Sequence, residues 1–304
     1  MIIPVRFSGE YQVQVLKADR TVRYHSHWMP NLVTNAGLDR VGSGSSFLND
    51  CYVGTGTVVP QVTDSALEQE VAGTSNRKDV SSGRLMEAPY GGRYQASWEF
   101  DLGEVVGNMS EVGIGWSSGG LFSRALFVDT NGDPTTITVL DDEILYITYR
   151  LFNYAPQADE TFTFSTPSGT RTAVVRPADL GNGDYRSGWG IQNGIQFGSD
   201  ARDRSLAREG ALGDEFSSPT GASSEASSGG SVKAYSVGSY YRDTEFYWSL
   251  SEANFATGIS AFLFRSQGLG VYQFSVDPPF MKTDADLLSM TFRTQWGRYD
   301  GDAE

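Results

Sequence analysis

Residues 93–100 read Arg-Tyr-Gln-Ala-Ser-Trp-Glu-Phe, and this octapeptide carries the pattern on which the fold assignment rests. Its apolar side chains fall at every second position, namely Tyr94, Ala96, Trp98 and Phe100. Because successive side chains of a strand point to opposite faces, the stretch is predicted to be a half-buried antiparallel strand with an aromatic inner face. Phe246, Trp248 and Leu250 repeat the same alternation.

The composition extends this strand prediction to the whole chain. The 304 residues include 35 glycines and an aromatic set of 17 Phe, 15 Tyr and 6 Trp. Frequent turns between aromatic and β-branched segments are typical of all-β proteins. Helical periodicity is nearly absent, and the best helical candidate is one or two turns at Asp64–Glu70, with Asp64 as the N-cap.

A diverged internal repeat predicts how the strands are grouped. Residues 141–150 and 284–293 share Asp, Leu, Thr and Arg at corresponding positions, and upstream Trp98 aligns with Trp248. We therefore predict two tandem antiparallel β-sandwich domains related by internal duplication, 1–154 and 158–304, joined by a short linker at 155–157. The Ser/Gly-rich segment 216–232 is predicted to be a surface loop of the second copy, matching a loop at 73–92 in the first.

Charge and cysteine content exclude several classes of protein. The chain has 23 basic and 37 acidic residues, a net charge of −14, which disfavours binding to nucleic acid and to anionic membranes. The single cysteine, Cys51, allows no intrachain disulfide and no multi-cysteine metal site. The apolar run at the N-terminus is interrupted by Arg6, and no run approaches the ~18 residues of a membrane span. We expect a soluble chain made in a cytoplasm.

Two short motifs resemble catalytic or metal sites, and each has a simpler interpretation. Gly115–Gly119 fits the Gly-x-Ser-x-Gly pattern of a hydrolase, but both histidines precede Ser117 and no α/β alternation surrounds it. A hairpin turn between strands ending at Ile114 and beginning at Leu121 explains it better. His25 and His27 share one face of a strand, yet nothing specifies the further ligands that zinc requires.

The remaining motifs also favour structural roles. Asp129–Asp133 begins like a calcium loop, but Pro134 and Leu140 stand where glycine and a bidentate glutamate belong, so an Asn-Gly turn is preferred. Gly54-Thr55-Gly56 lacks the rest of a phosphate loop. Three aromatics could stack on sugar rings, although core packing is the favoured interpretation: Tyr240, Tyr241 and Trp189. The sequence therefore assigns no catalytic, cofactor-binding or metal-binding residue.

Three stretches of the first copy carry a family resemblance. They are Asn31–Asp39, the run from Cys51 to Glu68, and the run from Ser110 to Leu145, which includes Phe-Ser-Arg-Ala-Leu-Phe at 122–127. In this order they resemble tail and tail-fibre structural proteins of tailed bacteriophages. The resemblance covers about residues 31–151, whereas the second copy lacks the Asn-Leu-Val-Thr and Phe-Ser-Arg-Ala-Leu-Phe segments. It implies a non-enzymatic structural component of the virion, in a tail fibre, baseplate or collar, assembled in the host bacterial cytoplasm.

The expected partners follow from the resemblance and from apolar surface. They are other virion proteins and further copies of the chain, as a trimer or a ring. The strand Ile144–Leu151 has apolar residues on both faces, so we expect a subunit to cover it, the rival being the segment 73–92. Met1–Phe7 is expected to be an arm that docks on a neighbour.

Two alternatives stay open: a carbohydrate-binding receptor module that contacts a host surface glycan, and a polysaccharide-degrading enzyme with two carboxylates across a cleft.

Overall fold

The computed structural model describes residues 1–117, 119–179, 188–191, 194–195, 197, 203–227 and 231–299. Strands hold 54% of the chain and helix 3%, which confirms the all-β class. The elements are β1 (Ile2–Lys17), β2 (Val22–His25), β3 (Met29–Pro30), β4 (Leu32–Val33), α1 (Asn35–Ser43), β5 (Asp50–Gly54), β6 (Glu70–Thr74), β7 (Arg77–Leu85), β8 (Gly91–Glu99), β9 (Gly107–Met109), β10 (Glu111–Trp116), β11 (Gly120–Leu126), β12 (Ile137–Val139), β13 (Glu143–Tyr154), β14 (Glu160–Thr166), β15 (Gly169–Pro177), β16 (Arg204–Arg208), β17 (Ser223–Glu225), β18 (Ser231–Val232), β19 (Tyr241–Trp248), β20 (Ile259–Ser266), β21 (Gly270–Phe280) and β22 (Leu288–Arg298).

The chain divides into two compact units. The first unit holds 7–82 and 94–152, and the second holds 1–6, 83–93 and 153–304. These bounds differ from the predicted division into 1–154 and 158–304, because two short segments of the predicted first copy belong to the second unit. The Met1 ammonium donates to the Thr291 carbonyl over 2.8 Å, and the Arg293 amide donates to the Met1 carbonyl over 2.6 Å. The expectation that Met1–Phe7 is an arm is therefore wrong, since these residues are built into the chain's own sheet.

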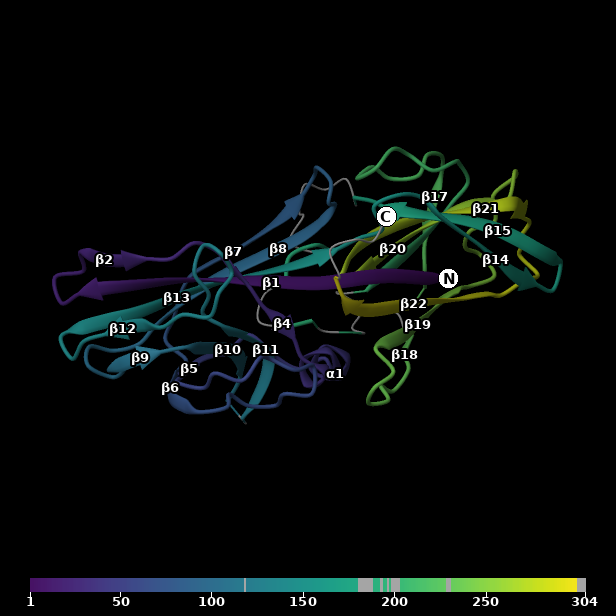
Figure 1. Cartoon of the computed structure of the whole chain (residues 1–304). Helices are drawn as coiled ribbons and strands as arrows, with labels where there is room; N and C mark the ends of the chain where they lie inside the picture. The colour runs from purple at the N-terminus through teal and green to yellow at the C-terminus, as the bar shows by residue number, and fades with distance from the viewer. Residues whose placement is uncertain are drawn as a thin grey trace. The chain divides into compact units, whose positions relative to one another are not determined.

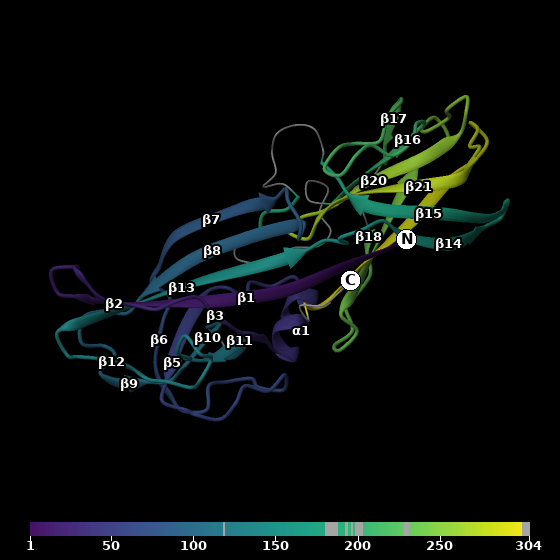
Figure 2. The ribbon, with the colours of Figure 1, turned by 45° about the horizontal axis from the view of Figure 1, so that its top comes forward.

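In the first unit two sheets pack face to face. One has the order β1-β13-β8-β7, with β2 and β3 also on β1, and the other has the order β4-β11-β10-β5-β6 (Figures 1 and 2). Phe7 meets Phe122 edge-on with ring centroids 6.3 Å apart, and the Tyr11 hydroxyl lies 2.7 Å from that of Ser123. Trp98 is fully buried and donates its indole N–H to the Asn49 carbonyl over 2.9 Å. Aromatic side chains thus fill the space between the sheets, as the alternation at 93–100 predicts.

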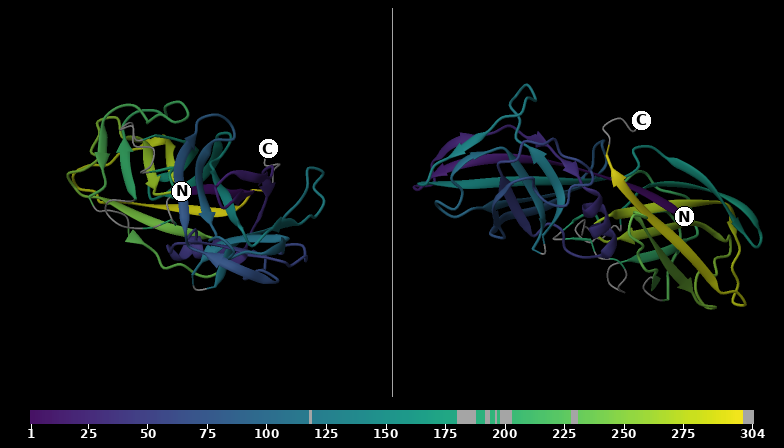
Figure 3. Two further views of the ribbon diagram at one scale, coloured as in Figure 1. Left: turned by 90° about the vertical axis from the view of Figure 1, so that its left-hand side faces the viewer. Right: turned by 60° about the horizontal axis from the view of Figure 1, so that its bottom comes forward.

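The second unit is built in the same manner. Its sheets have the orders β18-β19-β22, continued by the start of β1, and β14-β15-β21-β20-β16-β17. Figure 3 (right) shows the yellow β22 beside the green β19. Phe264 and Phe292 stack between the sheets with centroids 4.8 Å apart and an interplanar angle of 5°. Trp248 is fully buried and donates its indole N–H to the Ser224 carbonyl over 3.0 Å.

Three local predictions are wrong. The segment Asp64–Glu70 is irregular up to Gln69, and Glu70 begins β6, because the Asp64 carboxylate bonds the Gln61 amide and the distant Arg124 side chain. The segment 73–92 carries β7 and parts of its two neighbours, and the segment 216–232 includes β17 and β18. The nine-residue α1, absent from the sequence prediction, is capped by Thr34, whose hydroxyl accepts the Gly37 amide, and ends at the left-handed Gly44.

The order of strands corresponds between the units. β13-β8-β7 of the first unit matches β22-β19-β18 of the second, and β11-β10-β5-β6 matches β21-β20-β16-β17. The strand β1, which lies between β22 and β13 in the sheet order, departs from this correspondence. Met1 bonds both Thr291 and Arg293 of β22, the pattern of parallel strands, whereas the other pairings recorded between strands are antiparallel.

Truncation of either core tryptophan tests this packing. We expect Trp98→Ala and Trp248→Ala each to lower the free energy of unfolding by about 3–5 kcal/mol, because each leaves a large cavity and an unpaired carbonyl. Denaturant unfolding monitored by far-UV circular dichroism provides the measurement. Val237→Ala, at a side chain that is 85% exposed, is the matched control and should stay within about 0.5 kcal/mol of wild type. Tryptophan variants as stable as this control would contradict the packing.

Candidate functional site

The stretches that carry the family resemblance surround a buried carboxylate in the first unit. Glu111, on β10, is fully buried and accepts four hydrogen bonds. Three come from main-chain amides: Gly56 at 3.0 Å, Gln69 at 2.8 Å and Glu68 at 3.1 Å. The fourth comes from Nε of Arg124 at 2.9 Å. A buried charge is stable only when it is paired and hydrogen-bonded, and here the loop between β5 and β6 provides the donors.

Arg124, on the adjacent β11, extends this network into the same loop. Its guanidinium, only 3% exposed, donates to the Asp64 carboxylate over 2.6 Å and to the Val58 carbonyl over 3.0 Å. The Glu68 carboxylate in turn accepts the amides of Thr57 at 2.6 Å and Val58 at 2.7 Å. We call Glu111, Arg124, Asp64 and Glu68 the carboxylate–arginine cluster. It fixes the main chain of residues 56–69 at both ends.

The stretch Asn31–Asp39 is tied to the same sheet. The Thr34 hydroxyl donates to the Leu121 carbonyl over 2.5 Å and accepts the Gly37 amide over 2.8 Å. A Cβ at Gly37 would collide with the carbonyl oxygen of Phe122, so this helix can approach β11 only with glycine there. The Asn35 amide donates to the Val62 carbonyl over 2.7 Å, which joins the helix start to the clustered loop.

The cluster holds three apolar side chains toward solvent. Val58, Val59 and Val62 are 53%, 63% and 37% exposed, although their main chain is anchored by charged groups. Exposed apolar residues that are close together mark contact surfaces more often than isolated ones do. This valine loop, residues 58–62, is therefore a rigid apolar element on the surface of the first unit.

The motifs that were weighed as catalytic or metal sites and set aside lie apart from this cluster. Gly115–Gly119 belongs to the β10–β11 hairpin, as the hairpin interpretation predicted, and Ser117 is exposed in its turn. His25 and His27 are exposed, and the described residues include no group of three side chains able to hold a metal ion. The Asp129 carboxylate accepts the amides of Asn131 at 2.8 Å and Asp133 at 3.0 Å. These bonds lower the pKa of Asp129, and they complete a turn without an ion.

Of the three aromatics considered for sugar stacking, Trp189 is covered by the chain itself, whereas Tyr240 and Tyr241 are covered in part. Trp189 is 1% exposed and packs against Phe216 and Tyr272 in the core of the second unit. The guanidinium of Arg293 lies 3.8 Å over the centre of the Tyr241 ring. Tyr240, like Tyr241, is only half-buried, so the two retain some exposed surface.

Cys51 is fully buried, and this burial raises the pKa of its thiol.

The strand Ile144–Leu151 has no bare apolar face. Ile144 is 8% exposed within the chain, and the Tyr146 hydroxyl bonds the Asp79 carboxylate of β7. Arg150 lies 3.7 Å over the Trp28 ring and pairs with Glu10 over 3.2 Å. These partners lie in the same sheet as β13 or, for Trp28, between β2 and β3, and Tyr146 and Arg150 stay half-buried, so a subunit on this face stays a prediction.

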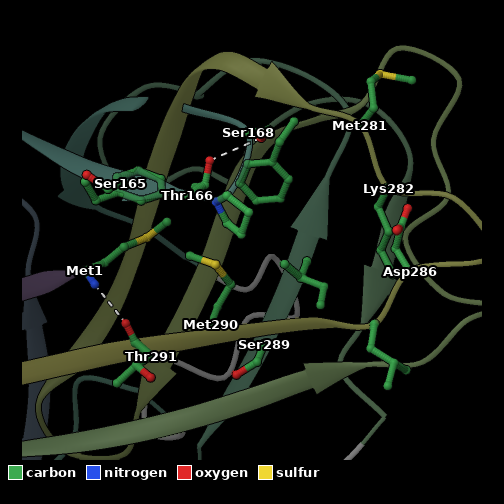
Figure 4. A pocket seen from close by; sticks show the side chains of 15 residues that line it. Met1, Ser165, Thr166, Ser168, Met281, Lys282, Asp286, Ser289, Met290 and Thr291 are labelled. Atoms are coloured by element: carbon green, nitrogen blue, oxygen red, sulfur yellow. Dashed lines mark hydrogen bonds between the residues drawn. The ribbon is translucent and has the colours of Figure 1, made fainter. Parts of the chain in front are cut away.

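A groove of about 470 Å³ opens in the second unit between the β14–β15 hairpin and the start of β22 (Figure 4). Met1, Met281 and Met290 line it together with polar side chains such as Ser165 and Ser289. The nearby Lys282 ammonium is already bonded to the Asn254 side chain at 2.8 Å and to two main-chain carbonyls. The groove is apolar, and its polar groups serve the fold rather than converge on one point.

Comparisons with known proteins give no relative. No family model, no curated protein and no solved structure matches this chain. Within the part of the chain that the structure describes, no helix has the length and apolar character needed to cross a membrane. The candidate sites are therefore judged on their geometry alone.

Loss of Arg124 tests the carboxylate–arginine cluster. We expect Arg124→Met to lower the free energy of unfolding by about 3–5 kcal/mol, because Glu111 is left as an uncompensated buried charge. Hydrogen exchange should quicken at the amides of Gly56, Glu68 and Gln69. Arg204→Met is the matched control, since Arg204 pairs with the exposed Glu225 at the surface and should cost at most about 1 kcal/mol. Equal losses in the two variants would show that the cluster does not hold the loop.

Proposed function

We propose that this protein is a non-enzymatic structural component of a bacteriophage virion, in the tail fibre, baseplate or collar. The observation that carries the proposal is the carboxylate–arginine cluster. All three stretches that resemble phage tail proteins meet around it, and their polar residues bond main chain and one another. Residues used in this way shape a surface and leave no pair of groups poised for chemistry. The acidic, all-β chain also suits a particle protein that does not contact nucleic acid.

We also propose that the two units are copies of one β-sandwich, related by internal duplication over 1–154 and 158–304. The corresponding strand orders support this, as do the buried side chains of Trp98 and Trp248, which lie on the corresponding strands β8 and β19. The repeat pairs Arg150 with Arg293, and both guanidinium groups lie over an aromatic ring, at 3.7 Å from Trp28 and 3.8 Å from Tyr241. The two rings come from non-corresponding places, Trp28 between β2 and β3 and Tyr241 at the start of β19, so the support lies in the shared arginine position alone.

The proposed partners are other virion proteins and further copies of the chain, as a trimer or ring. The valine loop supports a protein partner, since it is apolar, exposed and held without flexibility. An anchored loop loses little conformational entropy on binding, so the contact retains more of its interaction energy. The neighbouring carboxylates of Asp64 and Glu68 are engaged by Arg124 and main-chain amides, which reduces the charge around the loop.

Analysis of intact particles tests this function. Mass spectrometry of purified virions that encode the chain should detect it, and cryo-electron microscopy should place it in the tail. Val58→Ser, Val59→Ser and Val62→Ser combined should leave folding intact and reduce incorporation at least tenfold. The control is Val237→Ser, at a valine of the second unit that is 85% exposed, more than any of the three loop valines. Absence from purified particles, or turnover of host capsule or lipopolysaccharide by the purified chain, would refute the proposal.

A further inference from the structure

A second cavity of about 470 Å³ lies in the second unit, beside the segment 155–159. It is lined by the start of β1, the end of β13, the start of β14 and Tyr299 after β22, with Pro4, Arg6, Tyr154, Glu160 and Tyr299 among its residues. Its volume falls in the range of about 300–1,000 Å³ that small-molecule sites occupy. Unlike the groove beside the β14–β15 hairpin, it combines aromatic rings with charged groups that form no ion pair among the described residues.

Two tyrosines form its aromatic part. The rings of Tyr154 and Tyr299 lie with centroids 4.4 Å apart at 43°, and both are half-buried at the cavity. The pair is a rigid apolar surface that still carries two hydroxyl groups. Such surfaces bind ligands that have one apolar and one polar side.

The polar part consists of Arg6 and Glu160. The Arg6 guanidinium lies against the main chain of β22, where Gly297 leaves room: a Cβ there would be 3.7 Å from Nη1 of Arg6. Arg6 donates to the Val5 carbonyl over 3.2 Å, which leaves most of its five N–H donors available. None of the ion pairs within 4.0 Å among the described residues includes Arg6 or Glu160. Partial desolvation raises the pKa of Glu160, and the charge of Arg6 opposes that rise.

The neighbouring polar groups hold the wall in place. The Gln157 side chain accepts the Tyr90 amide over 2.6 Å and donates to the Tyr90 carbonyl over 3.0 Å. The Asp159 carboxylate accepts Nε of Arg176 over 2.8 Å. With these groups committed, the charged groups that a ligand meets are Arg6 and Glu160, next to the aromatic pair and its hydroxyl groups.

This arrangement discriminates between classes of ligand. An anion bound to Arg6 would be repelled by Glu160, and a cation bound to Glu160 would be repelled by Arg6. A neutral polyhydroxyl ligand can hydrogen-bond to both side chains without repulsion, since one hydroxyl accepts from the Arg6 guanidinium and another donates to the Glu160 carboxylate. Its C–H face packs on the tyrosine rings. We propose that the cavity is a binding subsite for one residue of a neutral carbohydrate. This site is a property of the isolated chain and does not depend on where the chain lies in a virion.

Binding of simple sugars to the full chain tests the proposal. The probes are D-glucose, D-galactose and N-acetyl-D-glucosamine, with N-acetylneuraminic acid and inorganic phosphate as anionic comparisons. Saturation-transfer NMR and calorimetry should show at least one neutral sugar binding with a Kd of about 1 mM, as expected for a ligand of this size. The anions should bind at least tenfold more weakly.

Variants locate the bound sugar. Tyr299→Ala should weaken binding at least tenfold, whereas Tyr299→Phe should keep most of the affinity. Glu160→Gln should weaken binding several-fold, and because Glu160 is exposed this substitution does not threaten folding. Tyr247→Ala, at a 43% exposed tyrosine of β19, is the control and should bind as wild type does. The proposal is overturned if no neutral sugar binds the folded wild type at 20-fold the expected Kd (~20 mM). It is overturned equally if binding survives both Tyr299→Ala and Glu160→Gln, or if an anion binds more tightly. Failure here would leave the virion proposal standing, because that rests on particle composition.

Discussion

An alternation of buried and half-buried side chains from Ile3 to Val15 of β1 constrains the whole chain. Ile3 and Val5 fill the second unit, and Phe7, Tyr11, Val13 and Val15 fill the first, all from one face of a single sixteen-residue strand. A register shift of one residue would turn this entire face to solvent. The strand therefore fixes which face of each sheet is apolar, and the aromatic residues of the opposing sheets complete the two cores.

Apolar packing alone does not account for the surface of the first unit. The loop between β5 and β6 has few buried side chains, and ionic hydrogen bonds position it instead. Glu111 satisfies three amides that would otherwise lack partners, and Arg124 neutralises that carboxylate while it binds Asp64. A buried ion pair contributes little net stability, but it penalises any other arrangement of its partners strongly. This is how a loop with three exposed valines keeps one conformation.

The second unit uses its charged residues differently. Arg293 is paired with Asp243 and lies over Tyr241, and Arg176 is paired with Asp159, so these cations stabilise the fold. Arg6 and Glu160 face one cavity without such pairing, beside two tyrosine rings. Groups left uncommitted in a concave, partly aromatic site are the usual basis of ligand recognition. One chain thus combines a group of exposed valines in one unit with a separate cavity in the other.

The sequence by itself determined the features that depend on neighbouring residues. Alternation at 93–100 and 246–250 predicted strands with buried tryptophans, and the glycines at 115–119 predicted a hairpin, because side-chain direction and turn geometry are local properties of the backbone. It missed α1, which has only nine residues, and it read Asp64–Glu70 as helix although Arg124, sixty residues away, bonds Asp64. It favoured core packing for Trp189, which is buried, but gave no sign that Arg6 and Glu160 would line one cavity. Only the tertiary structure decided these, since ion pairs, burial and cavities depend on which distant strands the topology brings together.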